Sequence, residues 1–198
     1  MVVVSGSNAQ QVAEQLAIAL EWDHVKLEAR RFPDSEGYIR IPEEQIEAIR
    51  SEPVVVVSNT FPDAGIVETM LILKAVSDVR KGSMENLRGI EPQKMEDIGP
   101  GVYLAVPYFG YSRQDKRFKP GEVISARAIA DMLADQCDGL AVLDLHAPKV
   151  LENLSIPVAF TTAMPELATH LQAEVNPDFI LSPDKGAIER ASQVASLI

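Results

Sequence analysis

Three short runs of apolar residues without polar alternation set the strongest limit on what this chain can fold into. They cover residues 2–4, 54–57 and 140–145 and consist almost wholly of Val and Leu. Strands that lack alternation are buried on both faces, which is typical of a parallel sheet covered by helices. Each run precedes a helical pattern, and a further strand is expected over Val102–Val106. The sequence therefore predicts a doubly wound, mainly parallel α/β fold, whose ligands bind beyond the carboxyl ends of the strands.

Three helices are expected after these strands, with Asn8, Asp63 and Ser125 as their capping residues. The second helix is expected to run to about residue 79. The helical spacing also predicts two buried apolar stripes, one made of Val12, Leu16 and Leu20 and the other of Ile129, Met132 and Leu133.

Two interruptions suggest how the chain is divided. Residues 81–100 contain three Gly, two Pro and seven charged residues between a helix and a strand, which predicts a surface insertion. A weaker boundary near residue 150 predicts a complete first domain over 1–150 and the start of a second, similar domain over 151–198. In the second part we expect strands at 158–161 and 179–182, and helices at 165–171 and from Lys185.

Composition excludes several classes of protein. The chain has 198 residues, 46% of them hydrophobic, and a formal net charge of −11. The negative balance argues against a nucleic-acid partner, because binding to phosphate backbones needs clustered positive charge. A single Cys excludes an internal disulfide framework, and no apolar run reaches the roughly 20 residues that a membrane span needs. We therefore expect a cytoplasmic protein with no membrane partner.

A local reversal of charge follows the strand at Val102–Val106. Four of the seven residues from 113 to 119 are basic, and they begin with Arg113, Gln114 and Asp115. Arg113 has the fork geometry that suits phosphate oxygens, and a strand's carboxyl end is where an α/β fold binds anions. From the residues alone, a phosphate site and a solvated basic loop remain equally open.

Two further groups of polar residues have both a functional and a structural interpretation. His146 and Asp184 each follow an expected strand and can share a Mg²⁺ ion with waters and nucleotide oxygens. Alternatively, His146 packs or caps locally and Asp184 only caps the next helix. The segment at 32–41 predicts an exposed hairpin or an interface arm, or simply a turn with solvated charges.

Several common motifs are absent from the sequence. There is no G-x-x-x-x-G-K-[ST], no G-x-G-x-x-G after the first strand and no G-x-S-x-G. These absences argue against a Walker ATPase, an ordinary dinucleotide dehydrogenase and an α/β-hydrolase. One Cys and three scattered His also do not make a zinc ligand set.

Four segments in the same order resemble the ribose-phosphate pyrophosphokinase family, whose fold is phosphoribosyltransferase-like. They read FPDSEGYIRI at 32–41, VPYFGYSRQD at 106–115, LDLHAP at 143–148 and SPDKGAIERA at 182–191. The resemblance implies transfer of a pyrophosphoryl group from MgATP to the 1-hydroxyl of ribose 5-phosphate, with AMP leaving.

The resemblance also implies roles for individual residues. Arg113, Gln114 and Asp115 match the ATP-binding Arg-Gln-Asp of the family, and Arg113 and His146 match catalytic positions. His146 and Asp184 match positions that hold Mg²⁺ directly or through water. The hairpin residues that match a loop holding the adenine and ribose of a neighbouring subunit's ATP are Phe32, Asp34 and Glu36. This last match implies a homodimer or a higher homo-oligomer.

The chain departs from the family pattern at several positions. Ser35 stands where Gly is usual, and Lys74 stands where the helix usually carries Asp. The chain also contains no Asp-Asp pair and no adjacent glycines, whereas the family uses such a segment to hold the 5-phosphate of ribose. Two functions therefore stay open: a diphosphokinase represented by a shortened chain, or a non-catalytic nucleotide-binding or regulatory subunit. A phosphoribosyltransferase is a weaker third interpretation, because its defining ribose-phosphate loop is the missing part.

Overall fold

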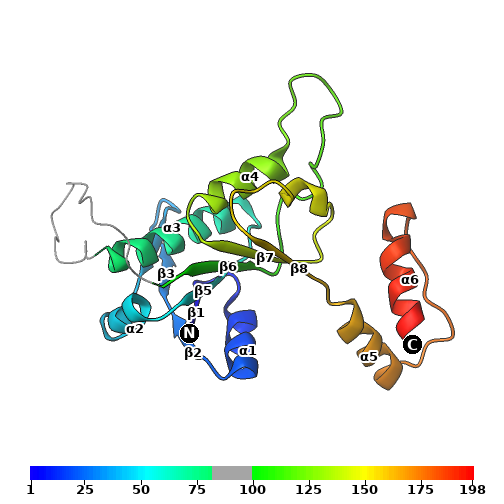
Figure 1. The fold of residues 1–198 in the computed structure, drawn as a ribbon, viewed down its shortest axis with the longest axis horizontal. Coiled ribbons are helices and arrows are strands. Elements are labelled where there is room, and N and C mark those ends of the chain that lie inside the picture. Colours follow the sequence, from blue (N-terminus) through cyan, green and yellow to red (C-terminus); the bar gives the residue numbers. More distant parts are fainter. Residues whose placement is uncertain (82–99) are drawn as a thin grey trace. The chain divides into compact units, whose positions relative to one another are not determined.

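The computed structural model describes residues 1–81 and 100–198, drawn in colour in Figure 1. It forms two compact units, Met1–Phe160 and Thr161–Ile198, each described here by itself. The predicted surface insertion at 81–100 lies almost entirely outside the described residues. The predicted division into domains at 1–150 and 151–198 stays a prediction.

The first unit is built on a six-stranded sheet with the order β2-β1-β5-β6-β7-β8. The strands are β1 (Val2–Ser5), β2 (Asp23–Lys26), β5 (Val54–Val57), β6 (Val102–Val106), β7 (Gly139–Leu143) and β8 (Val158–Thr161). The pairs β1–β2, β1–β5, β5–β6 and β6–β7 are all parallel. This sheet confirms the predicted α/β class. However, β8, predicted as the first strand of a second domain, is an edge strand of this sheet.

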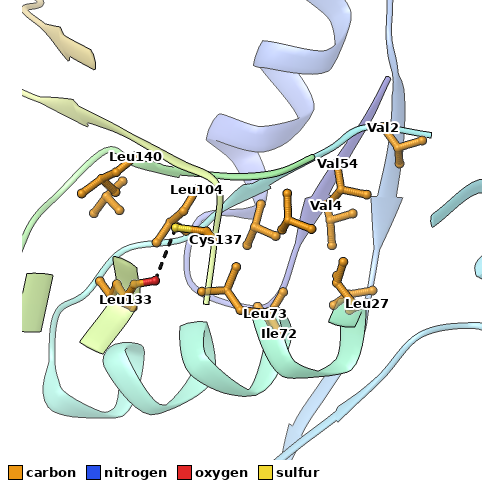
Figure 2. Close-up of a cluster of buried hydrophobic side chains, with 14 of the residues drawn as sticks. Val2, Val4, Leu27, Val54, Ile72, Leu73, Leu104, Leu133, Cys137 and Leu140 are labelled. Atoms are coloured by element: carbon orange, nitrogen blue, oxygen red, sulfur yellow. Dashed lines mark hydrogen bonds between the residues drawn. The ribbon is translucent and has the colours of Figure 1, made fainter. Parts of the chain in front are cut away.

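Helices lie on both faces of the sheet, which favours apolar residues on both sides of its inner strands, although Tyr103 of β6 stays 41% exposed. Helices α2 (Ile46–Ser51), α3 (Asp63–Arg80) and α4 (Ser125–Ala134) contribute to the larger apolar cluster, and α1 (Gln10–Leu20) to the smaller. Alternate residues of β1 point to opposite faces, since Val2 and Val4 belong to the larger cluster and Val3 to the smaller. Figure 2 shows the larger cluster, including Cys137, whose thiol donates to the Leu133 carbonyl at 3.4 Å. Burial raises the pKa of that thiol to about 11.

In the described part of the first unit, two short 3₁₀ helices and a hairpin accompany the sheet and its helices. The 3₁₀ segments are Glu43–Gln45 and Pro148–Leu151. The hairpin consists of β3 (Glu28–Arg31) and β4 (Gly37–Arg40), which pair antiparallel and form a separate two-stranded sheet. Of the interpretations left open for residues 32–41, an exposed hairpin is formed, with its first strand lying ahead of that segment.

The three predicted helix caps are wrong in position. Asn8 lies two residues before α1, and its side-chain oxygen accepts hydrogen bonds from β5's loop instead of from the helix. Asp63 and Ser125 are the first residues of α3 and α4, and no side-chain hydrogen bond caps either helix. The helices themselves begin within one or two residues of the predicted starts.

The buried face of α1 also differs from the predicted stripe. Val12 and Leu20 are 48% and 41% exposed, and Leu16 is the member of the predicted stripe that packs, partly buried, against the smaller cluster. Ala13 and Ala17 are buried in that cluster with Val3 and Val57. Small side chains let the helix backbone lie close to the sheet, so the alanine face is the one that packs. In α4, by contrast, Leu133 is buried as predicted while Met132 is exposed.

The second unit contains α5 (Met164–Glu174), the 3₁₀ segment Lys185–Ala187 and α6 (Ile188–Leu197). The strand predicted at 179–182 is not formed. Its apolar side chains Phe179 and Leu181 are 80% and 81% exposed, so among the described residues this segment packs into neither a sheet nor a core. Across the residues that the structure describes, no helix is long and apolar enough to cross a membrane.

Candidate functional site

Two loops at the carboxyl edge of the sheet are joined by a reciprocal pair of asparagines. The Asn59 amide after β5 donates to Asn8 Oδ1 at 2.9 Å, and Asn59 Nδ2 donates to the Asn8 carbonyl at 3.0 Å. Asn8 Nδ2 completes the exchange by donating to the Asn59 carbonyl at 3.2 Å. These bonds fix the loops after β1 and β5 at the edge where α/β proteins bind their ligands.

The loop after β6 is fastened to the same asparagine and to its neighbour Thr60. The Tyr108 amide donates to Asn59 Oδ1 at 2.9 Å, and the Gly110 amide donates to Thr60 Oγ1 at 2.8 Å. A Cβ on Gly110 would lie 2.2 Å from the Thr60 carbonyl oxygen, so only glycine allows this approach. The loop that carries the predicted anion-binding residues therefore starts from a fixed point.

Tyr111 forms a second connection between this loop and α3. Its backbone has a φ of 62°, in the left-handed region that a bulky side chain rarely adopts. Its hydroxyl donates to Asp63 Oδ1 at 2.7 Å, and this hydrogen bond, with the nearby negative charge, raises the pKa of Tyr111. The turn closes when the Gln114 amide donates to the Tyr111 carbonyl at 2.9 Å.

Arg113, Gln114 and Asp115 follow directly and differ in their surroundings. Arg113 is exposed, and among the residues at 1–81 and 100–198 its guanidinium has no hydrogen-bond or ion-pair partner. Gln114 is half-buried and accepts, through its carbonyl, a bond from the Ala126 amide in the first turn of α4. The structure therefore places an uncommitted guanidinium at the carboxyl edge of the sheet, on a loop tied down on both sides.

Asp115 lines a cavity of about 540 Å³ together with the segment that follows His146. The other lining residues are Ile124, Arg127, Ala147, Pro148, Lys149 and Val150. The loop after β6 and the loop after β7 thus meet around one hollow, as expected for neighbouring parallel strands. His146 itself is exposed and immediately precedes this lining.

The loop after Asp115 is held largely by one residue, Glu122. Glu122 accepts hydrogen bonds from the Phe118 and Lys119 amides at 2.6 and 3.1 Å, and its carbonyl accepts from Arg117 Nε at 2.8 Å. Lys116 lies over the Phe118 ring, 5.3 Å from its centroid. The backbone of this part of the loop is therefore organised around Glu122, and Arg113 lies directly ahead of it.

The hairpin turn holds the other predicted nucleotide-binding residues. Asp34 Oδ1 accepts a bond from the Glu36 amide at 3.1 Å, and the Phe32 amide donates to the Glu36 carbonyl at 2.9 Å. Phe32, Asp34 and Glu36 are all exposed. Ser35 has a φ of 76°, which gives a physical reason for a glycine at this position.

The two predicted metal ligands come from different parts of the chain. His146 lies in the first unit and Asp184 in the second, and no group of three or more His, Cys, Asp or Glu that could hold a metal occurs in the described parts of the chain. Asp184 Oδ1 accepts a bond from the Ala187 amide at 3.0 Å, so it caps the following helical segment, as one of the two interpretations expected. One imidazole and one carboxylate leave most of the octahedron that Mg²⁺ requires to other ligands.

Sequence reasoning missed the residues that position the loop. Asn8, Asn59, Thr60 and the Tyr111–Asp63 pair do this through hydrogen bonds that span about 50 residues of sequence. The polar run SNT directly after the strand at 54–57 was the available signal, because polar residues at a strand's carboxyl end are placed at the ligand edge.

Comparison with known proteins gives one family match and several similar chains. The model of the N-terminal domain of ribose phosphate pyrophosphokinase matches residues 1–136. The ribose-phosphate pyrophosphokinase of Methanothermobacter thermautotrophicus is 34% identical over 199 residues, covering 99% of this chain and 61% of that protein. That of Sulfurisphaera tokodaii is 32% identical over 198 residues, covering 98% of this chain and 60% of that protein.

A solved structure shares the fold at lower sequence identity. The crystal structure of phosphoribosylpyrophosphate synthetase from Mycobacterium smegmatis superimposes with a TM-score of 0.73 and 22% identity, over 98% of this chain and 60% of that one. The chain thus spans about 60% of the length of the relatives that it matches.

Proposed function

Because the chain belongs to the ribose-phosphate pyrophosphokinase family, we propose that it serves the transfer of a pyrophosphoryl group from ATP to ribose 5-phosphate. In that reaction the 1-hydroxyl of the sugar attacks the β-phosphorus of ATP, the bond to the α-phosphate oxygen breaks, and phosphoribosyl pyrophosphate and AMP leave. The single observation that supports this most is the uncommitted Arg113 guanidinium at the carboxyl edge of the sheet.

Arg113 is the group that we assign to the triphosphate. A guanidinium binds two phosphate oxygens at once and keeps its charge at any physiological pH, so it offsets negative charge that builds up at the transferring group. Gln114 and Asp115 lie next to it on the same fixed loop, and we propose that they bind the nucleotide. Positioning and charge neutralisation are the main contributions of a protein to phosphoryl transfer chemistry.

We propose that magnesium accompanies the nucleotide, with His146 and Asp184 as the protein groups that would hold it directly or through water. Bound there, the ion would neutralise phosphate charge. Most of its ligands would then be phosphate oxygens and water, since the chain offers one imidazole and one carboxylate.

The hairpin supports a proposal about assembly. Phe32, Asp34 and Glu36 project from a two-stranded sheet separate from the main one and are exposed. We propose that they bind the adenine and ribose of ATP held by a second copy of the chain, so the working form is a homodimer or a higher homo-oligomer. A cytoplasmic location and the absence of nucleic-acid and membrane partners also remain predictions.

A second candidate function is a non-catalytic nucleotide-binding or regulatory subunit. Such a subunit would keep the nucleotide contacts assigned here to Arg113, Gln114 and Asp115 without transferring a group. The diphosphokinase and a nucleotide-binding subunit both require nucleotide binding, whereas only the diphosphokinase requires turnover with ribose 5-phosphate.

Calorimetry with MgATP tests the site that both functions share. Arg113→Ala is expected to weaken MgATP binding by at least about tenfold, because charge-assisted hydrogen bonds are lost. Arg50→Ala is the matched control, since Arg50 is an exposed arginine in the last turn of α2, ahead of the amino end of β5. An affinity that Arg113→Ala leaves unchanged would remove the assignment of the nucleotide site.

Release of AMP from MgATP, measured with and without ribose 5-phosphate, separates the two functions. Release that depends on ribose 5-phosphate supports the diphosphokinase. Nucleotide binding without such release supports the nucleotide-binding subunit.

A further inference from the structure

Arg30 lies between two aromatic rings on one face of the hairpin. It is directly opposite Tyr38 in the register of β3 and β4, and Phe32 follows two residues later on the same side. Its guanidinium carbon is 4.2 Å from the centroid of the Tyr38 ring and 4.7 Å from that of Phe32. The two rings also meet edge to face, with centroids 5.7 Å apart and an interplanar angle of 84°. These three side chains form one cluster, which we call the Arg30 cluster.

The Arg30 cluster orders a side chain that its position alone would leave free. Phe32 is 39% exposed and begins the turn after β3, where an isolated phenylalanine ring would rotate among several orientations. A guanidinium over an aromatic face is attracted by the ring's quadrupole, and Arg30 makes this contact with both rings at once. The edge of Tyr38 then limits the ring of Phe32 from a second direction.

A Phe32 ring that is ordered before the ligand binds increases the affinity for that ligand. A ligand that stacks on a mobile ring must also immobilise it, and that cost is removed when the ring is already held. Neither Arg30 nor Tyr38 belongs to the residues that the family resemblance assigns to the nucleotide.

We propose that Arg30 and Tyr38 are positioning residues that hold the Phe32 ring ready to stack on the base of the nucleotide. This inference rests on the proposed function, because it takes Phe32 to be a contact of the base. Arg30 acts on the ring and has no role toward the phosphates, which distinguishes it from Arg113. Its effect should therefore depend on whether the ligand carries a base.

Two ligands and four proteins test this prediction by calorimetry. The ligands are MgATP and magnesium tripolyphosphate, which share the phosphate chain while only the first has a base. The proteins are the unsubstituted chain, Arg30→Ala, Arg30→Lys and the control Arg40→Ala. Arg40 is an arginine of the same hairpin that pairs with Glu28 and has no ring contact among the described residues.

Arg30→Ala is expected to weaken MgATP binding about fivefold, the size of a cation–π contact, and to leave tripolyphosphate binding unchanged. Arg30→Lys should recover part of the lost affinity, because an ammonium group also binds a ring face. Arg40→Ala should match the unsubstituted chain with both ligands.

Any other pattern of affinities contradicts either the role of Arg30 or the proposed function. Equal losses for both ligands, or an equal loss in Arg40→Ala, would mean that Arg30 only supports the hairpin. Normal MgATP affinity in Arg30→Ala, with Arg113→Ala still defective, would overturn this inference and leave the proposed function in place. An unsubstituted chain that binds neither ligand would overturn the proposed function and this inference with it.

Discussion

At the scale of single residues, Gly110 is the position where the loop with Arg113 tolerates least change. Gly110→Ala would place a Cβ 2.2 Å from the Thr60 carbonyl oxygen, a backbone atom that cannot rotate away. We expect the free energy of unfolding to fall by about 2 kcal/mol, within the range for overpacking a tight site. Urea unfolding followed by circular dichroism measures this change.

The control for this substitution is Gly37→Ala, at a glycine with room for a methyl group. A Cβ there would come no closer than 3.4 Å to Leu71 Cδ1, an ordinary contact. We expect a change below about 0.5 kcal/mol, as for most surface substitutions. Similar losses at both glycines would mean that the approach of Gly110 to Thr60 is not what requires glycine.

The same residue scale explains where prediction from the sequence failed. Asn8 and Asp63 have the side chains of helix caps and lie near helix starts, but Asn8 bonds to Asn59 and Asp63 accepts from Tyr111. A carboxylate or amide serves a helix end or a distant loop equally well, and the sequence around it is the same in both cases. Only the position of residues about 50 places away decides which bond forms.

At the scale of elements, the turn between β3 and β4 carries strain at Ser35. Its φ of 76° costs an L-residue about 1 kcal/mol or more, whereas glycine adopts it freely. Since the Ser35 amide also closes the turn on the Phe32 carbonyl at 2.9 Å, the conformation cannot relax without losing that bond. Ser35→Gly should therefore stabilise the fold by about 0.5 kcal/mol in urea unfolding, after the greater flexibility of glycine is subtracted.

Asp34→Gly is the matched comparison in the same turn. It adds the same backbone freedom, relieves no positive φ and removes the Asp34 Oδ1 acceptor of the Glu36 amide. We expect it to destabilise the chain. Stabilisation by both substitutions, or by neither, would contradict the account of Ser35.

Apolar patterns in the sequence predicted the buried strands better than they predicted the packed face of a helix. The unalternated runs predicted strands that are buried on both faces, and β1 and β5 are buried along almost their whole length. In β6, which was not one of these runs, burial alternates and Tyr103 is 41% exposed. In α1 both faces carry apolar residues, and the sequence cannot tell which one packs. The alanine face packs because it lets the helix approach β1 and β5 closely.

At the scale of the whole molecule, stability is concentrated in the first unit. Both apolar clusters are made of residues between 2 and 158. In the second unit, Ala168 and Val194 are the fully buried hydrophobic residues. Residues 151–198 were predicted as the start of a domain, and the strand predicted within them at 179–182 is not formed.

A chain that ends at Ala163, and so keeps all of β8, tests this distribution. We expect its free energy of unfolding to lie within about 1 kcal/mol of that of the 198-residue chain, because both clusters remain intact and burial of apolar area dominates stability. Leu133→Ala, which removes a fully buried side chain from the larger cluster, should cost about 2–5 kcal/mol in either chain. A loss of several kcal/mol on shortening alone would show that residues 164–198 contribute to the stability of the first unit.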